Sequence, residues 1–432
     1  MLEISFIGVL IGLAVAIGLM IKQLNPMVSM FLGAIVGSLV GGANLDQVLH
    51  NIIIQGGQSS VGIMVRILAG GVLTGVLIES GAAETIAKTI VEKLGEKRVL
   101  PALAIASALL LLVGVFLTVS VVILAPIALS VAKKTKISKM AIIVALSGGA
   151  KAGNIVSPNP NAIAAAEAFD LPLTDVMING FIPGILGLIA TILIANTLVK
   201  KGPEVSEEDF KDTPDASTTK LPSFGEAMVG PIVAIALLMI TPVANILGIG
   251  FLQDFRLDPF IALPVGALVG ALIMRRERDF LSFTNAGVVR VTPIVLMLFG
   301  AGTLSSMITN SDFPGLILGL IDTLGISAVF LAPISGTIMG SAAGSAAIGS
   351  AIASQSFGDV LLAYGVPAIS AAVMIHAGVM FFDIVPHGNY FQASKDSVKV
   401  TIMDRIKCMP YEAVIGGIMT VTATIVYGFI LG

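Results

Sequence analysis

The stretch Lys151-Ala-Gly-Asn-Ile-Val-Ser-Pro-Asn-Pro-Asn161 lies inside a long apolar run and cannot continue a regular helix. Pro158 and Pro160 each lack a backbone donor and clash with the preceding turn. In a membrane, freed backbone groups are tolerated only where protein or water satisfies them, so a broken helix there lines an enclosed cavity. Its short amides and hydroxyl suit a cavity that holds a polar solute. A proline kink with local caps is the alternative interpretation.

A second interruption near the other end of the chain argues against an isolated kink. The sequence Asp383-Ile-Val-Pro-His-Gly-Asn389 parallels Asn154-Ile-Val-Ser-Pro-Asn-Pro-Asn161. Interrupted apolar segments at corresponding places in two halves mark the binding site of many secondary transporters. The pair therefore predicts a transporter site formed by both halves.

The composition defines the class of protein. The 432 residues are 56% hydrophobic and 12% charged, with a mean hydropathy of +1.00. Apolar runs of about 20 residues recur, as in multi-pass membrane proteins, and the charge is too sparse to cover a large soluble protein. The net charge of −3 says nothing about nucleic acid, but the sequence has no basic tract that could follow phosphates, so we expect no nucleic acid partner. The first apolar segment, 4–21, is predicted to be a retained span.

The residue pattern does not indicate a metal site or a cofactor site. One cysteine, Cys408, excludes an internal disulfide and a multi-cysteine metal site. The three histidines have no metal-ligand spacing, and no phosphate-binding loop is present. We therefore expect no metal, no cofactor and no enzymatic activity.

The first half is predicted to contain scaffold spans within 4–80, a re-entrant hairpin over 99–132 and a broken helix over 140–169. The scaffold spans are 4–21, 27–43 and 64–78, with a loop at 44–62 that includes a short helix, and an amphipathic surface helix follows at 84–98. A return span over 176–199 leads to a charged linker, 200–224, for which we expect a cytoplasmic position and little fixed structure.

The hairpin follows from its length and its flanks. The run 99–132 is uncharged, and basic residues flank it on both sides. Two crossings with a turn need about 40 residues or more, and a single crossing would place the two basic flanks on opposite sides. A hairpin that enters and leaves from the cytoplasm meets both limits, with its tip near Gly114–Ser120.

The second half, 225–432, repeats this order. It has scaffold spans within 227–308 (227–247, 259–274 and 291–308), a hairpin over 326–355 with its tip at Gly340–Ser345, a broken helix over 367–389 and a last span over 413–430. No Lys or Arg occurs between Arg290 and Lys395, so this hairpin enters from the outside. Arg256 alone violates the charge rule. The prediction is an all-α polytopic membrane protein of two inverted repeats, with about ten transmembrane helices and two opposed re-entrant hairpins.

Two stretches resemble the gluconate:proton symporter (GntP) family. They are Ser147-Gly-Gly-Ala-Lys-Ala-Gly-Asn-Ile-Val-Ser-Pro-Asn-Pro-Asn-Ala-Ile-Ala-Ala-Ala and Met409-Pro-Tyr-Glu-Ala-Val-Ile-Gly-Gly-Ile-Met-Thr, and the resemblance covers essentially the whole chain. It implies a homodimer in which a transport domain moves elevator-fashion against a scaffold domain. It also implies a substrate among gluconate, ketogluconates, related sugar acids, glycerate and D-serine. The segment His376-Ala-Gly-Val-Met-Phe-Phe is less polar than in gluconate members, which leaves the particular sugar acid open.

The predicted substrate site uses the hairpin tips and the helix breaks. Helix N-termini present unpaired N–H groups and suit a carboxylate. The residues expected to bind the substrate are Lys151, Asn154, Ser157, Asn159, Asn161, Thr118, Ser120, Ser341, Ser345 and Asn389. Helix packing is the alternative for any single serine or threonine. Lys151 is expected to pair with an anionic substrate, or else with a carboxylate of the protein.

Ionisable groups inside the membrane are expected to be functional because burying them is costly. Asp383 and His387 form the predicted proton-coupling pair, with a helix cap as the alternative for His387. His376 is predicted to be a satisfied core histidine. Arg66 and Glu79 are predicted to snorkel to the membrane surface. Glu167 fits either a pore mouth or the protein surface.

These features predict proton-coupled uptake of gluconate or a related small hydroxylated monocarboxylate across the cytoplasmic (inner) membrane. Asp383 stands where the first half has Asn154, and protonation explains an acid there better than packing does. Sodium coupling through carbonyls and hydroxyls at the breaks is the alternative, as is D-serine or glycerate as substrate. A channel is less favoured, because the doubled inverted order permits alternating access.

Overall fold

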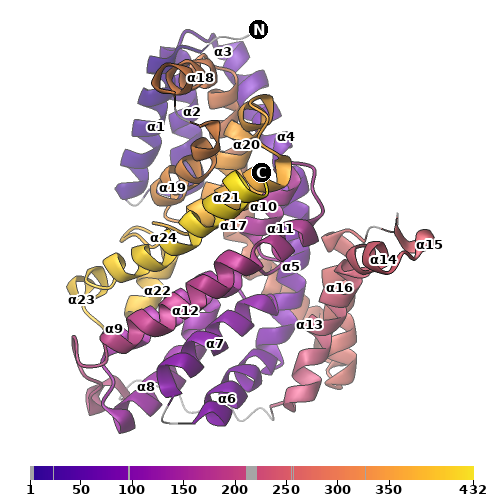
Figure 1. Cartoon of the computed structure of the whole chain (residues 1–432), viewed down its shortest axis with the longest axis vertical. Helices are drawn as coiled ribbons and strands as arrows, with labels where there is room; N and C mark the ends of the chain where they lie inside the picture. Colours follow the sequence, from indigo (N-terminus) through magenta and orange to yellow (C-terminus); the bar gives the residue numbers. More distant parts are fainter. Residues whose placement is uncertain are drawn as a thin grey trace.

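The computed structural model describes residues 4–22, 24–95, 98–210, 221–253, 255, 257–325 and 327–432. This part of the chain is helical, with a single isolated bridge between Ile4 and Ser311. Arg256 and residues 211–220 of the linker lie outside the described residues. The helices form an elongated molecule with the N-terminal helices at one end and the C-terminus near the middle (Figure 1).

The apolar helices identify a multi-pass membrane protein. Five described helices are long and apolar enough to cross a membrane, or up to seven if each bent pair is one span, and six further apolar helices have 10–17 residues. The two bent pairs are α11 (Leu173–Asn179) with α12 (Phe181–Thr197), at 44°, and α13 (Phe224–Leu238) with α14 (Ile240–Leu247), at 54°. The prediction of about ten spans therefore counts several helices that are short for a full crossing.

The first half begins with a tightly packed helix pair. Its elements are α1 (Phe6–Ile21), α2 (Pro26–Val40), α3 (Leu45–Gln47), the π-helix η1 (Val48–Ile54), α4 (Gln55–Ser59), α5 (Val61–Glu79) and α6 (Ala82–Leu94). The helices α1 and α2 lie so close together that a Cβ at Gly8 or Gly12 would meet the backbone of α2. Small residues allow such contact between helices in a membrane.

The loop predicted over 44–62 is wrong, because this segment is helical and leads directly into α5. Asn44 and Gln47 form a capping box that starts the helix. Gly56 lies against the backbone of Gly302, where a side chain would not fit. Tertiary contact thus overrides the low helix propensity of the glycines.

A second long helix, α17 (Phe280–Thr309), begins well before the span predicted over 291–308. Its first turns pack on α5, with Gly287 against the backbone of Gly71 and Gly75. Arg290 forms an ion pair with Glu79 of α5. Glu79 therefore has a partner within the protein, and its position relative to the membrane surface stays a prediction.

Each half contains a helical hairpin with its turn where the sequence places the tip. The first hairpin joins α7 (Val99–Leu112) to α8 (Leu117–Thr135), and the second joins α19 (Leu331–Ala343) to α20 (Ala346–Ala363). Gly114 and Gly344 adopt positive φ angles of 98° and 58° in the two turns. Glycine adopts this backbone conformation without steric cost.

Each half also contains a broken helix. The first is α9 (Lys139–Asn154) with α10 (Pro160–Ala168), and the second is α21 (Ala368–Val379) with α22 (Asn389–Val398). The arm α8 of the first hairpin packs on α22, and the arm α20 of the second packs on α10. Each hairpin thereby contacts the broken helix of the other half.

The remaining described elements complete the fold. They are η3 (Glu207–Phe210), α15 (Gly250–Gln253), α16 (Pro259–Ile273), η4 (Glu277–Asp279), α18 (Phe313–Leu324), η5 (Ala328–Phe330), α23 (Ile402–Ile406), α24 (Met409–Ile425) and η6 (Val426–Ile430). The helix α18 is absent from the sequence-based prediction. The ring of Phe313 at its start stacks on Phe6 of α1 at 5.4 Å.

The linker has more structure than predicted. In its described part, Asp209 is buried and forms an ion pair with Lys139 at the start of α9, at 2.7 Å. Lys139 also donates to the carbonyl of Lys399, directly after α22, at 2.9 Å. Lys133 pairs with Glu207 and lies over the ring of Phe210. These contacts dock η3 against α8 and α9.

Candidate functional site

The first residues of four helices meet at one cavity of about 120 Å³. The helices are α8, α10, α20 and α22, so both hairpins and both broken helices contribute. The cavity is lined by Leu111, Val115, Phe116, Leu117, Thr118, Asn154, Asn159, Pro160, Asn161, Ile294, Met297, Gly344, Ser345, Ala346, Ala347, Asp383, Asn389 and Tyr390. Each N-terminus directs partial positive charge toward this space.

Three of these four helix N-termini have no side-chain cap. The N-cap residues of α8, α20 and α22 are Phe116, Ser345 and Gly388, and none of their side chains accepts from the first turn. In α10, by contrast, Asn159 accepts from the backbone N–H groups of Asn161 and Ala162, at 2.8 and 3.1 Å. Backbone donors are therefore available at the three uncapped termini.

The first break is satisfied by its own side chains. Asn159 Nδ2 donates to the carbonyl of Asn154 and to Ser157 Oγ, the latter at 2.8 Å. Ser157 Oγ also donates to the carbonyl of Asn154, at 3.2 Å. Both polar ends of the Asn159 amide are thus engaged within the motif, which makes Asn159 a capping residue.

Two buried groups at the cavity lack partners. In the described part of the chain, Asn161 Nδ2 and the hydroxyl of Tyr390 have no hydrogen-bond partner, although both residues line the cavity. The residues are 4% and 6% exposed. The backbone carbonyl of Asn161 accepts from Ser350 Oγ at 2.9 Å, which holds the residue against α20. Buried polar groups are normally paired, so a polar ligand is the natural partner for both.

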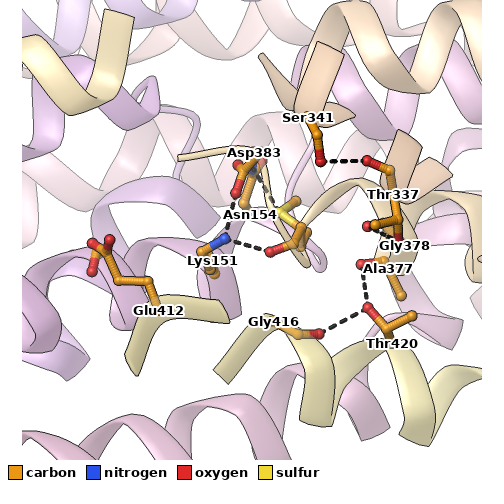
Figure 2. A network of polar contacts seen from close by, with 12 residues as sticks. Lys151, Asn154, Thr337, Ser341, Ala377, Gly378, Asp383, Glu412, Gly416 and Thr420 are labelled. Carbon is orange, nitrogen blue, oxygen red and sulfur yellow. Dashed lines mark hydrogen bonds and ion pairs between the residues drawn. The ribbon is translucent and has the colours of Figure 1, made fainter. Parts of the chain in front are cut away.

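The second break is satisfied by its own backbone N–H groups and, in addition, by side chains from distant elements. The last carbonyls of α21 accept from three different helices: Ala377 from Thr420 of α24 at 2.9 Å, Gly378 from Thr337 of α19 at 3.1 Å, and Met380 from Lys151 of α9. Figure 2 shows these donors around the end of the helix. Freed carbonyls need such partners inside a membrane.

Lys151 and Asp383 form a buried ion pair beside the cavity (Figure 2). Their side chains are 1% and 5% exposed. Asp383 lines the cavity, and Lys151 lies behind it, against Asp383 and the carbonyl of Met380. Lys151 therefore already has a carboxylate of the protein as partner, which is the alternative that the sequence leaves open.

A second buried ion pair lies close to the first. Glu412 of α24 is near Lys151 in Figure 2, and it accepts from both terminal nitrogens of Arg405 at 2.8 and 2.9 Å. Arg405 is fully buried, donates to Ser394 Oγ at 2.7 Å and lies over the ring of Phe391. The sequence places Arg405 in a cytoplasmic connection among other cations. The one sequence signal for this pair is that Glu412 follows Arg405 by seven residues.

The structure separates Asp383 from the other member of the predicted proton-coupling pair. His387 Nε2 lies 3.2 Å from the carbonyl of Ala342, near the tip of the second hairpin, and Asp383 contacts Lys151. His376 is fully buried, and in the described part of the chain neither of its ring nitrogens has a partner. The prediction of a satisfied core histidine is wrong in that respect.

The predicted hydroxyl and amide residues divide into two groups. Thr118, Ser345 and Asn389 line the cavity with the asparagines of the first break. Ser120 and Ser341 instead donate within their own helices, to the carbonyls of Leu117 and Thr337. Ile294 and Met297 of α17 also line the cavity and were missed, because apolar side chains on a long span carry no signal of a site.

Arg66 occupies a separate polar cavity of about 280 Å³ between α5, α10 and α16. It forms ion pairs with Glu167 and with Asp258, the latter at 2.7 Å. Gly62 leaves the space for the Glu167 carboxylate, since a Cβ there would overlap it. Arg66 therefore has two acidic partners within the protein, and Glu167 is the partner that links α10 to α5.

A polar cavity bounded by four helix N-termini and a buried ion pair, within a multi-pass helical protein, defines the class as a membrane transporter. The particular family follows from comparison with known proteins. The GntP family permease model matches residues 4–430. The chain belongs to the GntP permease family.

Three relatives illustrate this membership. An uncharacterized transporter of Haemophilus influenzae is 45% identical over 428 residues, covering 99% of each chain. The D-serine transporter DsdX of Escherichia coli K12 is 24% identical over 95% of this chain and 94% of its own. A high-affinity gluconate transporter of E. coli K12 is 22% identical over 92% of this chain and 93% of its own.

A solved structure shares the fold. The YdaH transporter of Alcanivorax borkumensis aligns with a TM-score of 0.65 and 16% identity, covering 89% of this chain and 90% of that one. The likeness extends over nearly the whole chain, so the described helices belong to one known transporter architecture.

Proposed function

We propose that the protein is a proton-coupled symporter that takes up gluconate, or a related small hydroxylated monocarboxylate, across the cytoplasmic (inner) membrane by alternating access. The observation that supports this most is the cavity where four helix N-termini meet two unpaired buried donors, Asn161 Nδ2 and the Tyr390 hydroxyl. The helix termini favour a carboxylate, and the donors favour hydroxyl oxygens.

The uncapped N-termini of α8, α20 and α22 would hold the substrate carboxylate. Asn161 and Tyr390 would bind hydroxyl groups, together with Thr118, Ser345 and Asn389 at the same cavity. Asn154 also lines the cavity, whereas Asn159 and Ser157 maintain the break that shapes it. Met297 and Ile294 supply an apolar wall against the carbon chain.

The architecture we propose is two inverted repeats in a homodimer, with the hairpins and broken helices as the transport domain. The crossed packing supports it, because α8 packs on α22 and α20 packs on α10. A two-fold relation between the halves would produce this exchange. The long helices α5 and α17 would belong to the scaffold, and Arg66 with Glu167 would join scaffold to transport domain.

Proton coupling through Asp383 is favoured over sodium coupling because carbonyl oxygens at both helix breaks already accept hydrogen bonds. Sodium needs several free oxygen ligands. At the second break the carbonyls of Ala377, Gly378 and Met380 accept from side chains, and at the first break the carbonyl of Asn154 does. Asp383, in contrast, lines the cavity and can exchange a proton with it.

A second candidate substrate is D-serine, as in the relative DsdX. The specific observation for it is that Asp383 lines the same cavity as the helix N-termini. A zwitterion would place its carboxylate at the termini and its ammonium group at Asp383. Both substrates use one site, so a competition assay distinguishes them.

The test is uptake of radiolabelled gluconate by purified protein in proteoliposomes, driven by an inward proton gradient without sodium. Unlabelled 2-ketogluconate, glycerate and D-serine are added as competitors. We expect accumulation of gluconate that collapses with a protonophore. Accumulation only in the presence of sodium would overturn the proton coupling, and failure of every hydroxy acid to compete or to accumulate would overturn the substrate class.

A further inference from the structure

The proposed substrate site does not by itself explain why Lys151 is buried in an ion pair with Asp383. Asp383 lines the cavity, whereas Lys151 does not, and Lys151 forms an ion pair with Asp383. The ammonium group of Lys151 is fully buried and already donates to two oxygens, those of Asp383 and Met380. A substrate carboxylate can take the place of Asp383 on Lys151 only if Asp383 gives up its negative charge.

The charges around the cavity sum to zero in this state. Lys151 and Asp383 cancel, and Arg405 and Glu412 on the neighbouring elements α23 and α24 cancel as well. The other titratable groups nearby are Tyr390 on α22, His376 on α21 and His387 in the second break. Tyrosine is neutral in the physiological range, and the sum is taken over the two ion pairs.

A single added charge would disturb this balance. Entry of a substrate anion alone would leave the buried site with a net charge of −1, and a proton alone on Asp383 would leave it with +1. An uncompensated charge in a buried, low-dielectric site is strongly unfavourable. Entry of both returns the sum to zero.

We propose that Asp383 and the substrate carboxylate alternate as the partner of Lys151, so that each substrate anion is carried with one proton in an electroneutral cycle. The proposal rests on the proposed function and adds its stoichiometry. A proton from water binds the Asp383 carboxylate and the ion pair with Lys151 separates. Lys151 keeps its three protons throughout and donates to one oxygen of the substrate carboxylate, while the other oxygen accepts from the uncapped helix N-termini. The steps reverse on release.

This exchange makes coupling obligatory without a separate gate. The empty site and the fully loaded site carry the same charge, so both can move through the membrane interior. The two half-loaded states are charged, and their transfer is opposed by the cost of burying an unpaired charge. Uncoupled leak of protons or of substrate is thereby suppressed.

Binding to purified protein tests the exchange directly. Isothermal titration of gluconate is run at one pH in two buffers of different ionisation enthalpy, which gives the number of protons taken up per bound anion. We expect one for the wild type and none for Asp383→Asn, in which binding also becomes independent of pH. Gluconamide, which lacks the carboxylate, should bind without proton uptake in both proteins.

The variants at Lys151 complete the comparison. Lys151→Gln should lose the preference for gluconate over gluconamide, by tenfold or more. The double variant Lys151→Gln/Asp383→Asn removes both charges and serves as the matched control for folding, because neither partner is left unpaired. If the double variant kept the preference for gluconate, the carboxylate would bind elsewhere and the proposal would be wrong.

Transport gives an independent readout. In proteoliposomes with a potassium gradient and valinomycin, the initial rate of gluconate uptake should not change between zero and −100 mV at a fixed proton gradient. A rate that rises with the potential, or gluconate binding without proton uptake, would overturn the exchange and leave the proposed function standing. If no hydroxy acid binds at all, the proposed function itself fails and the proposal with it.

Discussion

The two helix breaks solve one problem in different ways. The first break, Ile155–Asn159, is closed by its own residues, with Asn159 and Ser157 donating to the carbonyl of Asn154. The second, between α21 and α22, combines local backbone donors with side-chain donors from α9, α19 and α24. A locally closed break keeps its shape wherever its helix moves. A break closed partly by its neighbours can change when a neighbour changes partner, which suits the element that carries the proton.

The largest effect is expected at the charged break. Asp383→Asn should abolish pH-driven accumulation of gluconate, because an amide cannot carry the proton. Exchange of labelled gluconate between two equally loaded compartments should be partly retained, since exchange needs no net proton movement. Both assays use the same proteoliposomes. Wild-type accumulation in the variant would remove the functional difference between the two breaks.

The next largest effect concerns the distant donors. Thr420→Val removes the side-chain donor to the carbonyl of Ala377, which then keeps only the backbone N–H of Met380, and should lower the free energy of unfolding by about 1 kcal/mol. Thr424→Val is the matched control, because the Thr424 hydroxyl donates within its own helix, to the carbonyl of Thr420. Thermal unfolding in detergent measures both. Equal losses would show that the contact with α21 contributes nothing beyond an ordinary helix hydroxyl.

Among the residues that line the cavity, the binding role and the capping role should separate. Asn161→Ala and Tyr390→Phe each remove an unpaired donor at the cavity and should raise the KM for gluconate by roughly tenfold, with little change in stability. The initial rate of uptake over a range of gluconate concentrations gives the KM. A KM that stays at the wild-type value in both variants would move the hydroxyl contacts to other residues.

Asn159→Ala should act mainly on stability. It removes the N-cap of α10 and should cost about 1 kcal/mol. The midpoint of thermal unfolding should fall, while the fraction of protein that survives purification should bind gluconate with near wild-type affinity. A loss of affinity without a loss of stability would assign Asn159 to the substrate rather than to the break.

The smallest effect is expected at Lys139, which lies at the start of α9 and also contacts the end of α22. Lys139 connects Asp209 of the linker to the carbonyl that follows α22. Burial raises the pKa of Asp209, but the donors Lys139 and Ser206 outweigh it, so the pKa lies below its ordinary value. The stabilisation is therefore present above about pH 4 and is lost as the pH falls through the lowered pKa. Asp209→Asn should lower the unfolding midpoint by about 2–4 °C at neutral pH, and the difference should close in acid.

The sequence predicted those parts of the site that depend on local chemistry. Proline and asparagine located the first break, and glycine located both hairpin turns, at Gly114 and Gly344. Those residues impose a backbone conformation wherever they occur. The class of protein followed from composition alone.

The sequence could not predict which distant residues pair with each other. Lys151 and Asp383 are separated by 232 positions, and their residue types allow a substrate contact as well as an ion pair. Arg405 was assigned to a solvated loop because its neighbours are cations, and only the fold shows that it is buried against Glu412. The free amide of Asn161 and the engaged amide of Asn159 look the same in the sequence. Their difference arises from which neighbours each amide contacts.

The seam between α5 and α17 has a consequence for how this protein can vary. At Gly75 and Gly287 the nearest atoms to an added Cβ all belong to the backbone of the opposite helix, so no side chain can rotate away. Most damaging substitutions in a protein core can be rescued by a smaller residue opposite. Here the residue opposite is already the smallest that exists. In a library of double mutants, pairs across this seam should therefore contain no second-site suppressors, while pairs across side-chain contacts should contain many.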